Sequence, residues 1–315
     1  MKIISQEQIK KLNIKPKQCV EWIKESFSLK EVSQLPAKIS LHPQGNDFFN
    51  TMPCLLPSPY NYYGVKVVHR IKGATPALGS DVLLYNSQTG ELLAMLHADW
   101  ITTMRTGAVA TLAMQTFRKS NAETYGFLGL GNTGRATMLC LLDSEPDVMH
   151  HVILMRYKDQ AESFIERFKE YSNVSFSICE DMKELVSQSD VIVSCITEAQ
   201  SLLCEDNTLY KEGCLVVPVH TRGFQNCDLF FDKVYADDTA HVCGFKYFNR
   251  FKQYGEIQDV ISGKIIGRES NEERILSYNI GLGLHDIVYA SKIYEILKDN
   301  SNEIAIERET VKFWI

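Results

Sequence analysis

The sequence predicts an α/β protein in which a doubly wound parallel sheet of the Rossmann type is joined to an α+β domain. A glycine-rich turn at residues 129–134 lies between a short apolar run and a helical pattern. After this turn, strand and helix patterns alternate roughly every 20–30 residues, which indicates a parallel sheet. Before it, alternating apolar runs separated by Pro, Gly and Asn indicate a mainly antiparallel sheet.

Length and composition narrow the class of protein. The 315 residues suffice for about two domains, and 45% of them are hydrophobic, as in globular proteins. The net charge of -6 and the lack of a basic run argue against a nucleic-acid partner. No apolar stretch reaches the ~20 residues of a membrane span, and the N-terminus has no apolar signal core. Nine cysteines without C-x-x-C pairs indicate reduced thiols in the cytoplasm, and no metal-ligand spacing is present.

The N-terminal part predicts two helices, a sheet and a long helix. One helix begins after Ser5 as N-cap, and a second runs from Pro16 to about Leu29. A third, from Ala98 to Phe117, has apolar residues at helical spacing. The predicted strands of the mainly antiparallel sheet are 38–41, 48–56, 62–68, 81–85 and 92–96, the last two joined by a hairpin turn at 88–90.

The C-terminal part predicts strands that alternate with helices. A final helix at about Leu284 to Leu297 is expected to return to the first domain. We therefore expect residues 1–120 plus about 284–315 to form one domain, and 121–283 to form a dinucleotide-binding domain. The predicted strands are 124–128, 152–155, 174–178, 191–194, 215–217 and 233–236, and the predicted helices begin at about 132, 160 and 181.

The turn at 129–134 has the G-x-G-x-x-G spacing of a dinucleotide site, in the strand–turn–helix context that this site requires. Gly129 permits the tight turn, Gly131 lets the backbone approach a pyrophosphate, and Gly134 lets helix and strand pack closely. Free N–H groups at the helix start favour phosphates, so Asn132 and Thr133 are candidate cofactor contacts as well. The alternative is a purely structural glycine turn.

The end of the second parallel strand bears on the choice between NAD and NADP. An acidic residue there accepts the ribose 2′-OH of NAD, whereas an arginine accommodates a 2′-phosphate. Arg156 occupies this point and Lys158 follows, which favours NADP(H). The alternative is that both cations are solvated loop charges and that the protein uses NAD(H). Cys195 and Thr197 follow the strand predicted at 191–194, where a nicotinamide ribose would lie. The alternative is that both residues only pack against their neighbours.

Two cations stand in apolar surroundings. Lys66 lies among β-branched residues of a predicted strand, either as a ligand of a substrate carboxylate and acid/base, or as an edge lysine that reaches solvent. Arg105 lies in an apolar helix beside small residues. It is either a bidentate carboxylate clamp or one half of a structural salt bridge.

Several stretches of the chain resemble the ornithine cyclodeaminase/mu-crystallin family. The resemblance covers nearly the whole chain, and the Thr-Gly-Glu segment with the later Arg-Thr-Gly is its most specific part. It implies a homodimer in which residues 1–120 plus about 284–315 form a substrate-binding and dimerisation domain beside the Rossmann domain. It also implies hydride transfer between a nicotinamide and a carbon that bears nitrogen. The stretches are 51–54, 64–68, 89–95, 101–108, 129–134, 190–197 and 283–286.

The resemblance also assigns roles to single residues. Lys66 and Arg105 match the family's substrate-carboxylate and acid/base positions. Lys38 falls where the family commonly has a carboxylate-binding arginine. Met52, in the matching Thr-Met-Pro stretch, is a candidate substrate contact, and Thr106 is a candidate cofactor contact.

One segment departs from the family pattern. Cyclodeaminases carry an acidic residue just after the strand before the catalytic loop, where this chain reads Val-His-Thr-Arg-Gly from Val219. An amine must lose a proton before hydride leaves its carbon, so a base is needed. Either Asp228 is brought in by a shifted loop, or His220 serves, or the chemistry differs. Arg222 is a candidate ligand for a second anionic group of the substrate.

Three functions fit these observations. The preferred one is an NAD(P)-dependent oxidoreductase that acts on a small amino acid or its imine, as amino-acid dehydrogenases and ketimine reductases do. The second is an ornithine cyclodeaminase, a lyase that forms proline and ammonia without net redox change. The third is a mu-crystallin-like protein that binds NADP(H) without turnover, and the glycine turn fits all three.

Overall fold

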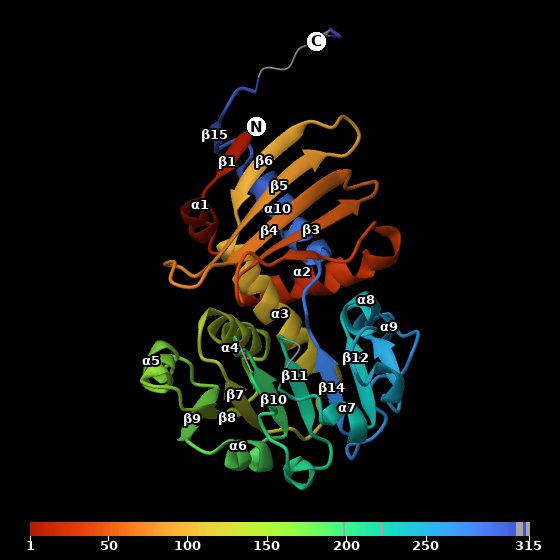
Figure 1. Cartoon of the computed structure of the whole chain (residues 1–315). Coiled ribbons are helices and arrows are strands. Elements are labelled where there is room, and N and C mark those ends of the chain that lie inside the picture. Colours follow the sequence, from red (N-terminus) through yellow and green to blue (C-terminus); the bar gives the residue numbers. More distant parts are fainter. Residues whose placement is uncertain (198, 221–222, 307–310, 313–315) are drawn as a thin grey trace. The chain divides into compact units, whose positions relative to one another are not determined.

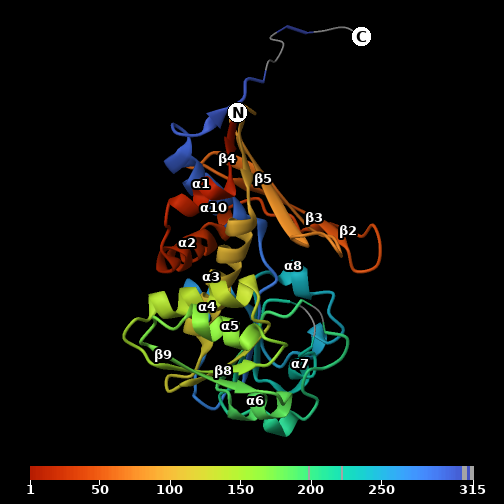
Figure 2. The ribbon, with the colours of Figure 1, turned by 90° about the vertical axis from the view of Figure 1, so that its left-hand side faces the viewer.

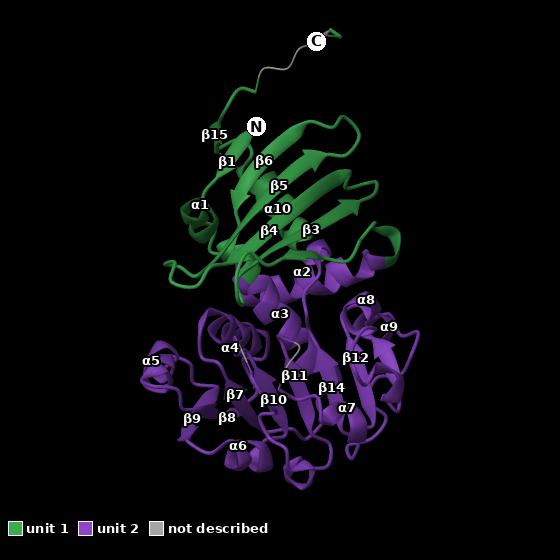
Figure 3. Ribbon diagram, in the orientation of Figure 1, with its two compact units in different colours: residues 1–13, 31–102, 286–315 green, residues 14–30, 103–285 purple. Residues whose placement is uncertain are grey.

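The computed structural model describes residues 1–197, 199–220, 223–306 and 311–312. The chain forms two compact units, and two of the four boundaries between them fall within α-helices, α3 (Asp99–Phe117) and α10 (Gly283–Leu297) (Figure 3). Within the described ranges, no helix has the length and apolar character needed to cross a bilayer. Unit 1 comprises Met1–Asn13, Glu31–Thr102 and Asp286–Ile315, and unit 2 comprises Ile14–Lys30 and Thr103–His285.

Unit 1 is a mainly antiparallel sheet with the strand order β15-β1-β6-β5-β4-β3-β2. β1 pairs with β6 in parallel, and the other pairings are antiparallel. α1 (Gln6–Lys11) begins with a capping box at Ser5, as its sequence predicts. The strands are β1 (Lys2–Ile4), β2 (Ile39–Leu41), β3 (Phe48–Leu56), β4 (Tyr62–Arg70), β5 (Leu78–Asn86), β6 (Leu92–His97) and β15 (Asn302–Glu303).

One face of this sheet is covered by α10, as Figures 1 and 2 show. Ile287 of this helix lies against Gly64 of β4, where an added Cβ atom would come within 2.5 Å of the Ile287 side chain. Alternate residues such as Met52, Cys54 and Leu84 are buried on the covered face. The close approach of helix and sheet therefore depends on a glycine at position 64.

Unit 2 is a parallel sheet with the strand order β13-β12-β14-β11-β10-β7-β8-β9. Its strands are β7 (Thr124–Leu128), β8 (His150–Met155), β9 (Val174–Cys179), β10 (Val191–Ser194), β11 (Leu215–Pro218), β12 (Lys233–Ala236), β13 (Tyr254–Glu256) and β14 (Ile275–Tyr278). They are short, and the inner strands β10, β11, β12 and β14 are buried throughout, as both faces of a doubly wound sheet require. The doubly wound parallel sheet predicted from the sequence is thus confirmed.

Helices lie on both faces of the unit 2 sheet. The connections β7-α4-β8 and β8-α5-β9 run in one direction across the sheet and the connection through α6 returns, so right-handed crossovers put α6 on the opposite face. Figure 2 shows α5 and α6 on opposite sides of β8. The helices are α2 (Pro16–Ser28), α4 (Asn132–Ser144), α5 (Gln160–Arg167), α6 (Met182–Gln188), α7 (Cys227–Phe230), α8 (Thr239–Val242) and α9 (Ile257–Ile261).

α2 and residues 103–117 belong to the parallel-sheet unit, although their position in the sequence suggested the N-terminal domain. Gly107 of α3 explains the association, because a Cβ atom there would come within 2.5 Å of the Ala136 and Thr137 backbone in α4. The Thr111 hydroxyl also donates to the Thr137 carbonyl oxygen at 3.2 Å. This close helix–helix packing attaches α3 to the dinucleotide-type sheet.

Candidate functional site

The glycine turn joins β7 to α4 in unit 2, and its three glycines differ in what surrounds them. Gly129 has φ +79°, and a Cβ atom on it would lie 2.4 Å from the backbone of Cys195. A Cβ atom on Gly134 would lie 2.4 Å from the Gly129 carbonyl oxygen. Gly131, the N-cap of α4, faces open space and contributes no capping side chain. The turn therefore leaves room for a ligand at the start of a helix, where backbone N–H groups favour phosphate.

This turn lies at the switch point of the sheet. β7 pairs with β8 on one side and with β10 on the other, and the chain proceeds outward in both directions. Ligands of doubly wound sheets bind outside the carboxyl ends of the strands at such a point. Cys195 directly follows β10, and its backbone N–H donates to the Leu128 carbonyl oxygen. Burial raises the pKa of the Cys195 thiol to about 12, so the thiol is neutral. Thr197 lies two residues further along the chain.

A serine–histidine pair lies at the same edge of the sheet. Ser194 ends β10, and His220 follows the neighbouring β11 by two residues. The Ser194 Oγ atom lies 2.6 Å from His220 Nε2, and Ser194 is buried while His220 is half-buried. A buried hydroxyl thus fixes one ring nitrogen of His220 at the carboxyl end of the sheet, an arrangement suited to an acid/base residue.

Arg156 directly follows β8, at the carboxyl end that sequence analysis singled out. Its guanidinium pairs with two carboxylates, Glu162 at 2.6 Å and Glu180 at 3.0 Å. These two hydrogen-bonded partners raise the pKa of Arg156, Glu162 contributing most. Lys158 has φ +53°, and its ammonium lies over the Tyr157 ring, 5.5 Å from the ring centroid. Arg156 is therefore a cation held by two carboxylates directly after β8.

Arg105 and Thr106 lie in the part of α3 that belongs to unit 2. Arg105 is 7% exposed and Thr106 is half-buried. The guanidinium of Arg105 lies close to the backbone of Gly281, in the loop between β14 and α10. Arg105 is therefore a buried cation in the apolar helix, and its role as a carboxylate clamp stays a prediction.

In unit 1, Lys66 of β4 forms an ion pair with Asp286 of α10. The two groups lie 2.7 Å apart, and neither side chain is exposed. Met52 is the cross-strand neighbour of Lys66 and is also buried. Burial, together with the negative charge of Asp286, raises the pKa of the nearby Cys54 thiol to about 12. The interpretation of Lys66 as an edge lysine that reaches solvent is therefore wrong, and its role as a substrate-carboxylate ligand or acid/base stays a prediction.

The remaining candidates differ in their surroundings. Lys38 is half-buried and directly precedes β2. Arg222 lies outside the described residues. Asp228 of α7 is 1% exposed and accepts a hydrogen bond from the Tyr278 hydroxyl at 2.8 Å. Burial raises the pKa of Asp228 to about 7 despite this bond, because its neighbours include the apolar side chains of Cys227 and Phe231.

Comparison with known proteins identifies the family. Residues 2–301 match the ornithine cyclodeaminase/mu-crystallin family. The chain belongs to this family. It is 26% identical over 324 residues to the Δ1-pyrroline-2-carboxylate reductase of Colwellia psychrerythraea, covering 95% of this chain and 100% of that protein.

Two solved structures share the fold of this family member. The Thermococcus litoralis Δ1-pyrroline-2-carboxylate reductase in complex with NADH and L-proline has a TM-score of 0.84 at 20% identity, covering 96% of this chain and 100% of that one. An archaeal alanine dehydrogenase dimer with bound NAD has a TM-score of 0.80 at 23% identity, covering 98% and 99%. The similarity extends along both units, so the family assignment does not depend on the glycine turn alone.

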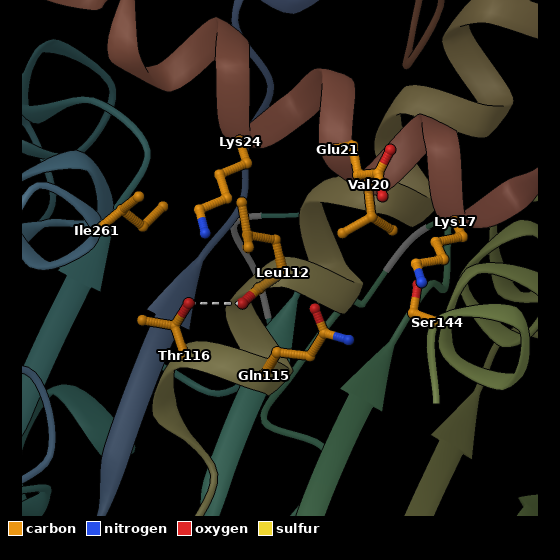
Figure 4. Close-up of a pocket in the computed structure, with 9 residues that line it drawn as sticks. All are labelled: Lys17, Val20, Glu21, Lys24, Leu112, Gln115, Thr116, Ser144 and Ile261. Atoms are coloured by element: carbon orange, nitrogen blue, oxygen red, sulfur yellow. Dashed lines mark hydrogen bonds between the residues drawn. The ribbon is translucent and has the colours of Figure 1, made fainter. Parts of the chain in front are cut away.

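Unit 2 also contains a groove that is separate from the carboxyl ends of its strands. It has a volume of about 400 Å³ and is lined by α2, the second half of α3 and the last residues of α4 and α9 (Figure 4). Ser144, at the end of α4, lines it, whereas the glycine turn is at the start of that helix. Thirteen helical residues separate the two ends by roughly 18 Å. None of the predicted site residues lines this groove.

Sequence analysis missed two residues that contact candidate site residues. Asp286 was noted only as part of a stretch that resembles the family. A carboxylate in an apolar helix and an ammonium in a buried strand each need a partner of opposite charge, and this could have paired Asp286 with Lys66. Ser194 was assigned to a strand end, and no local pattern connects it with a histidine 26 residues later.

Proposed function

We propose that this protein catalyses NAD(P)-dependent hydride transfer at the nitrogen-bearing carbon of a small amino acid or its imine. The proposal rests on the arrangement at the carboxyl ends of the unit 2 strands. There a glycine turn faces open space at a helix start, and a histidine held by Ser194 follows the neighbouring strand. Family membership and the activities of the reductase and alanine dehydrogenase relatives support this reaction class.

The residues of the glycine turn fit a dinucleotide. Gly131 leaves space where the pyrophosphate would approach, and the first N–H groups of α4, including those of Thr133 and Gly134, would hold it. Bound nicotinamide would supply or accept the hydride. Arg156 favours NADP(H) over NAD(H), because its two partners are exposed carboxylates and exposed ion pairs are weak enough to be exchanged for a phosphate.

The chain's own residues would bind the substrate and move a proton. Arg105 would bind the substrate carboxylate through a bidentate contact. His220 would take a proton from, or return it to, the substrate nitrogen, and Ser194 would hold the ring in place. We prefer His220 to Asp228, because Asp228 is enclosed in the apolar core and bonded to Tyr278.

A homodimer is also proposed, formed through the face of the unit 1 sheet opposite α10. On that face Pro53, Val65, Leu83 and Met95 form a continuous cross-strand row over β3–β6. Phe49, Val67 and Met95 are among its exposed apolar residues, and no helix of unit 1 covers this face within the described residues. Two such faces would pack as a pair of stacked sheets, in a dimer with a second copy of this chain.

The test is turnover by the purified protein with NADPH or NADH, followed at 340 nm. The substrates are Δ1-pyrroline-2-carboxylate, pyruvate with ammonia, and the corresponding amino acids in the reverse direction. Ornithine with catalytic NAD(P) tests the cyclodeaminase alternative through release of ammonia. No turnover in any arm, together with tight NADPH binding, would favour the non-catalytic alternative.

His220→Gln tests the acid/base role. We expect kcat to fall by about 10²- to 10⁴-fold while the Kd of the cofactor is unchanged. His151→Gln is the matched control, since His151 also lies beside a serine hydroxyl, Ser175 Oγ at 2.8 Å, but near the amino end of β8. Equal effects of both substitutions on kcat would contradict the assignment of His220.

A further inference from the structure

The guanidinium of Arg105 lies directly against the backbone of Gly281. An added Cβ atom at Gly281 would come within 2.4 Å of Arg105 Nη1, 3.1 Å of Cζ and 3.2 Å of Nη2. All three atoms belong to the planar end of the arginine side chain. Gly281 also has φ +98°, in the region that side-chain-bearing residues rarely adopt. The missing side chain of Gly281 therefore provides the space in which this guanidinium sits.

Gly281 is itself held by a buried carboxylate. Its backbone N–H donates to Asp237 Oδ2 at 2.5 Å, and Asp237 Oδ1 lies 3.3 Å from His241 Nδ1. Asp237 directly follows β12 and has no exposed surface. Burial opposes its ionisation, but the contacts with His241 and the Gly281 N–H outweigh burial and keep the pKa of Asp237 below its usual value. An ionised carboxylate thus fixes the loop that follows β14.

We propose that Gly281 and Asp237 are positioning residues, which set the plane of the Arg105 guanidinium for binding the substrate carboxylate. The inference rests on the proposed role of Arg105. A bidentate arginine–carboxylate contact needs both N–H groups in the carboxylate plane, so a small rotation of the guanidinium removes one of the two bonds. Asp237 contributes through Gly281, because it fixes the backbone on which the guanidinium rests.

Gly281→Ala is the decisive substitution, and Gly263→Ala is its matched control. Gly263 also has a positive φ, +76°, but its added Cβ atom would meet no atom within 4 Å. Both variants place a side chain at a positive φ, and only Gly281→Ala pushes on a guanidinium. We expect Gly281→Ala to raise KM for the amino acid or imine about 10- to 100-fold, with the Kd of the cofactor unchanged. Gly263→Ala should leave both constants within about twofold.

A double-mutant cycle separates positioning from general damage. In an Arg105→Ala background, Gly281→Ala should have no further effect on kcat/KM, because the group through which it acts is gone. An equal loss in both backgrounds would overturn the proposal. Asp237→Ala should raise the KM for the amino acid or imine, as Gly281→Ala does. If Asp237→Ala changed only cofactor binding, the proposal would also be overturned.

Crystal structures of the wild type and Gly281→Ala provide a readout that does not depend on activity. We expect the guanidinium of Arg105 to be displaced by about 1 Å or more in the variant, since the added methyl group cannot share its space. An unmoved guanidinium overturns the proposal whatever the kinetics. A displaced guanidinium in a protein that lacks all amino-acid and imine turnover would contradict the proposed function but not the positioning by Gly281.

Discussion

Lys66 and Asp286 form an ion pair 2.7 Å long in which neither side chain is exposed, although 220 positions separate them in the sequence. Lys66 is in the middle of β4, and Asp286 is in the first turn of α10. Each charge was removed from water on folding, and the attraction to the other offsets that cost. The pair therefore links the central strands of unit 1 to the helix that covers them.

Breaking this pair should cost more than replacing it. We expect Lys66→Met or Asp286→Leu alone to lower the free energy of unfolding by about 3–5 kcal/mol, because each leaves an uncompensated buried charge. The double variant Lys66→Met/Asp286→Leu should lose clearly less than the sum of the two, as measured by urea denaturation. Additive losses would show that the two charges do not stabilise each other, and would favour a separate partner for Lys66.

Arg156 is expected to determine cofactor preference. Arg156→Ala should weaken NADPH binding about 10- to 100-fold, because a charged contact with the 2′-phosphate is lost. NADH lacks this phosphate, so its binding should change by less than about threefold. Glu162→Gln with Glu180→Gln should strengthen NADPH binding several-fold, because the competing carboxylates are removed. The measurement is quenching of protein fluorescence by each cofactor.

Glu166→Gln serves as the control for these carboxylates. Glu166 lies on the same helix, α5, and pairs with Lys169 at 2.5 Å instead of with Arg156. Its substitution should leave the NADPH to NADH ratio unchanged. If Arg156→Ala weakened both cofactors equally, Arg156 would have a structural role and the preference for NADP(H) would be unsupported.

Much of the fold followed from local sequence patterns. β3 and β7 have the predicted bounds, and α2 ends within one residue of its predicted end. These elements have clear periodicity and Pro, Gly or Ser at their ends, so local interactions alone determine their position. The same holds for the glycine turn, in which Gly129 and Gly134 are sterically required and Gly131 leaves open space.

Other features depended on contacts that no local pattern records. β14 was missed, because Ile275–Tyr278 is a four-residue run that fits a strand or a buried helix equally well. Its place between β11 and β12 follows from chain crossover, which the order of elements does not specify. The Asp286 partner of Lys66 and the Gly281 contact of Arg105 were missed for the same reason. The sequence therefore predicted Lys66 and Arg105 as candidate site residues but not the groups that contact them.

The proposed dimer predicts the effect of a charge on the uncovered sheet face. Met95→Glu should convert the dimer to a monomer at micromolar concentration, because a carboxylate would be buried in an apolar sheet-to-sheet contact. Light scattering coupled to size-exclusion chromatography measures the mass. Met149→Glu is the matched control, since Met149 is also an exposed methionine (49% against 38% for Met95) but belongs to unit 2. A dimer that survives Met95→Glu would place the contact on another surface.

The raised pKa of Asp228 predicts how stability depends on pH. Burial raises this pKa from 3.8 to about 7, so between about pH 4 and 7 the unfolded chain carries the carboxylate and the folded chain carries the protonated acid. The folded state therefore binds the extra proton, and the contribution of Asp228 to stability falls as the pH rises through this window. Asp228→Asn keeps the shape without the charge. It should match the wild type near pH 4 and become more stable by up to about 1.4 kcal/mol per pH unit toward pH 7.

Asp232→Asn is a control of opposite sign on the same segment. Burial opposes the ionisation of Asp232, but the Arg274 backbone N–H and Lys252 outweigh it and lower its pKa. Its contribution is present at neutral pH and is lost as the pH falls, so Asp232→Asn should be less stable than the wild type at pH 7, with a difference that shrinks toward pH 3. Thermal unfolding at pH 4, 5.5 and 7.5 compares the three proteins. If Asp228→Asn were destabilised at pH 7.5, the Asp228 carboxylate would be ionised and supported in the folded protein, and its candidacy as the catalytic base would return.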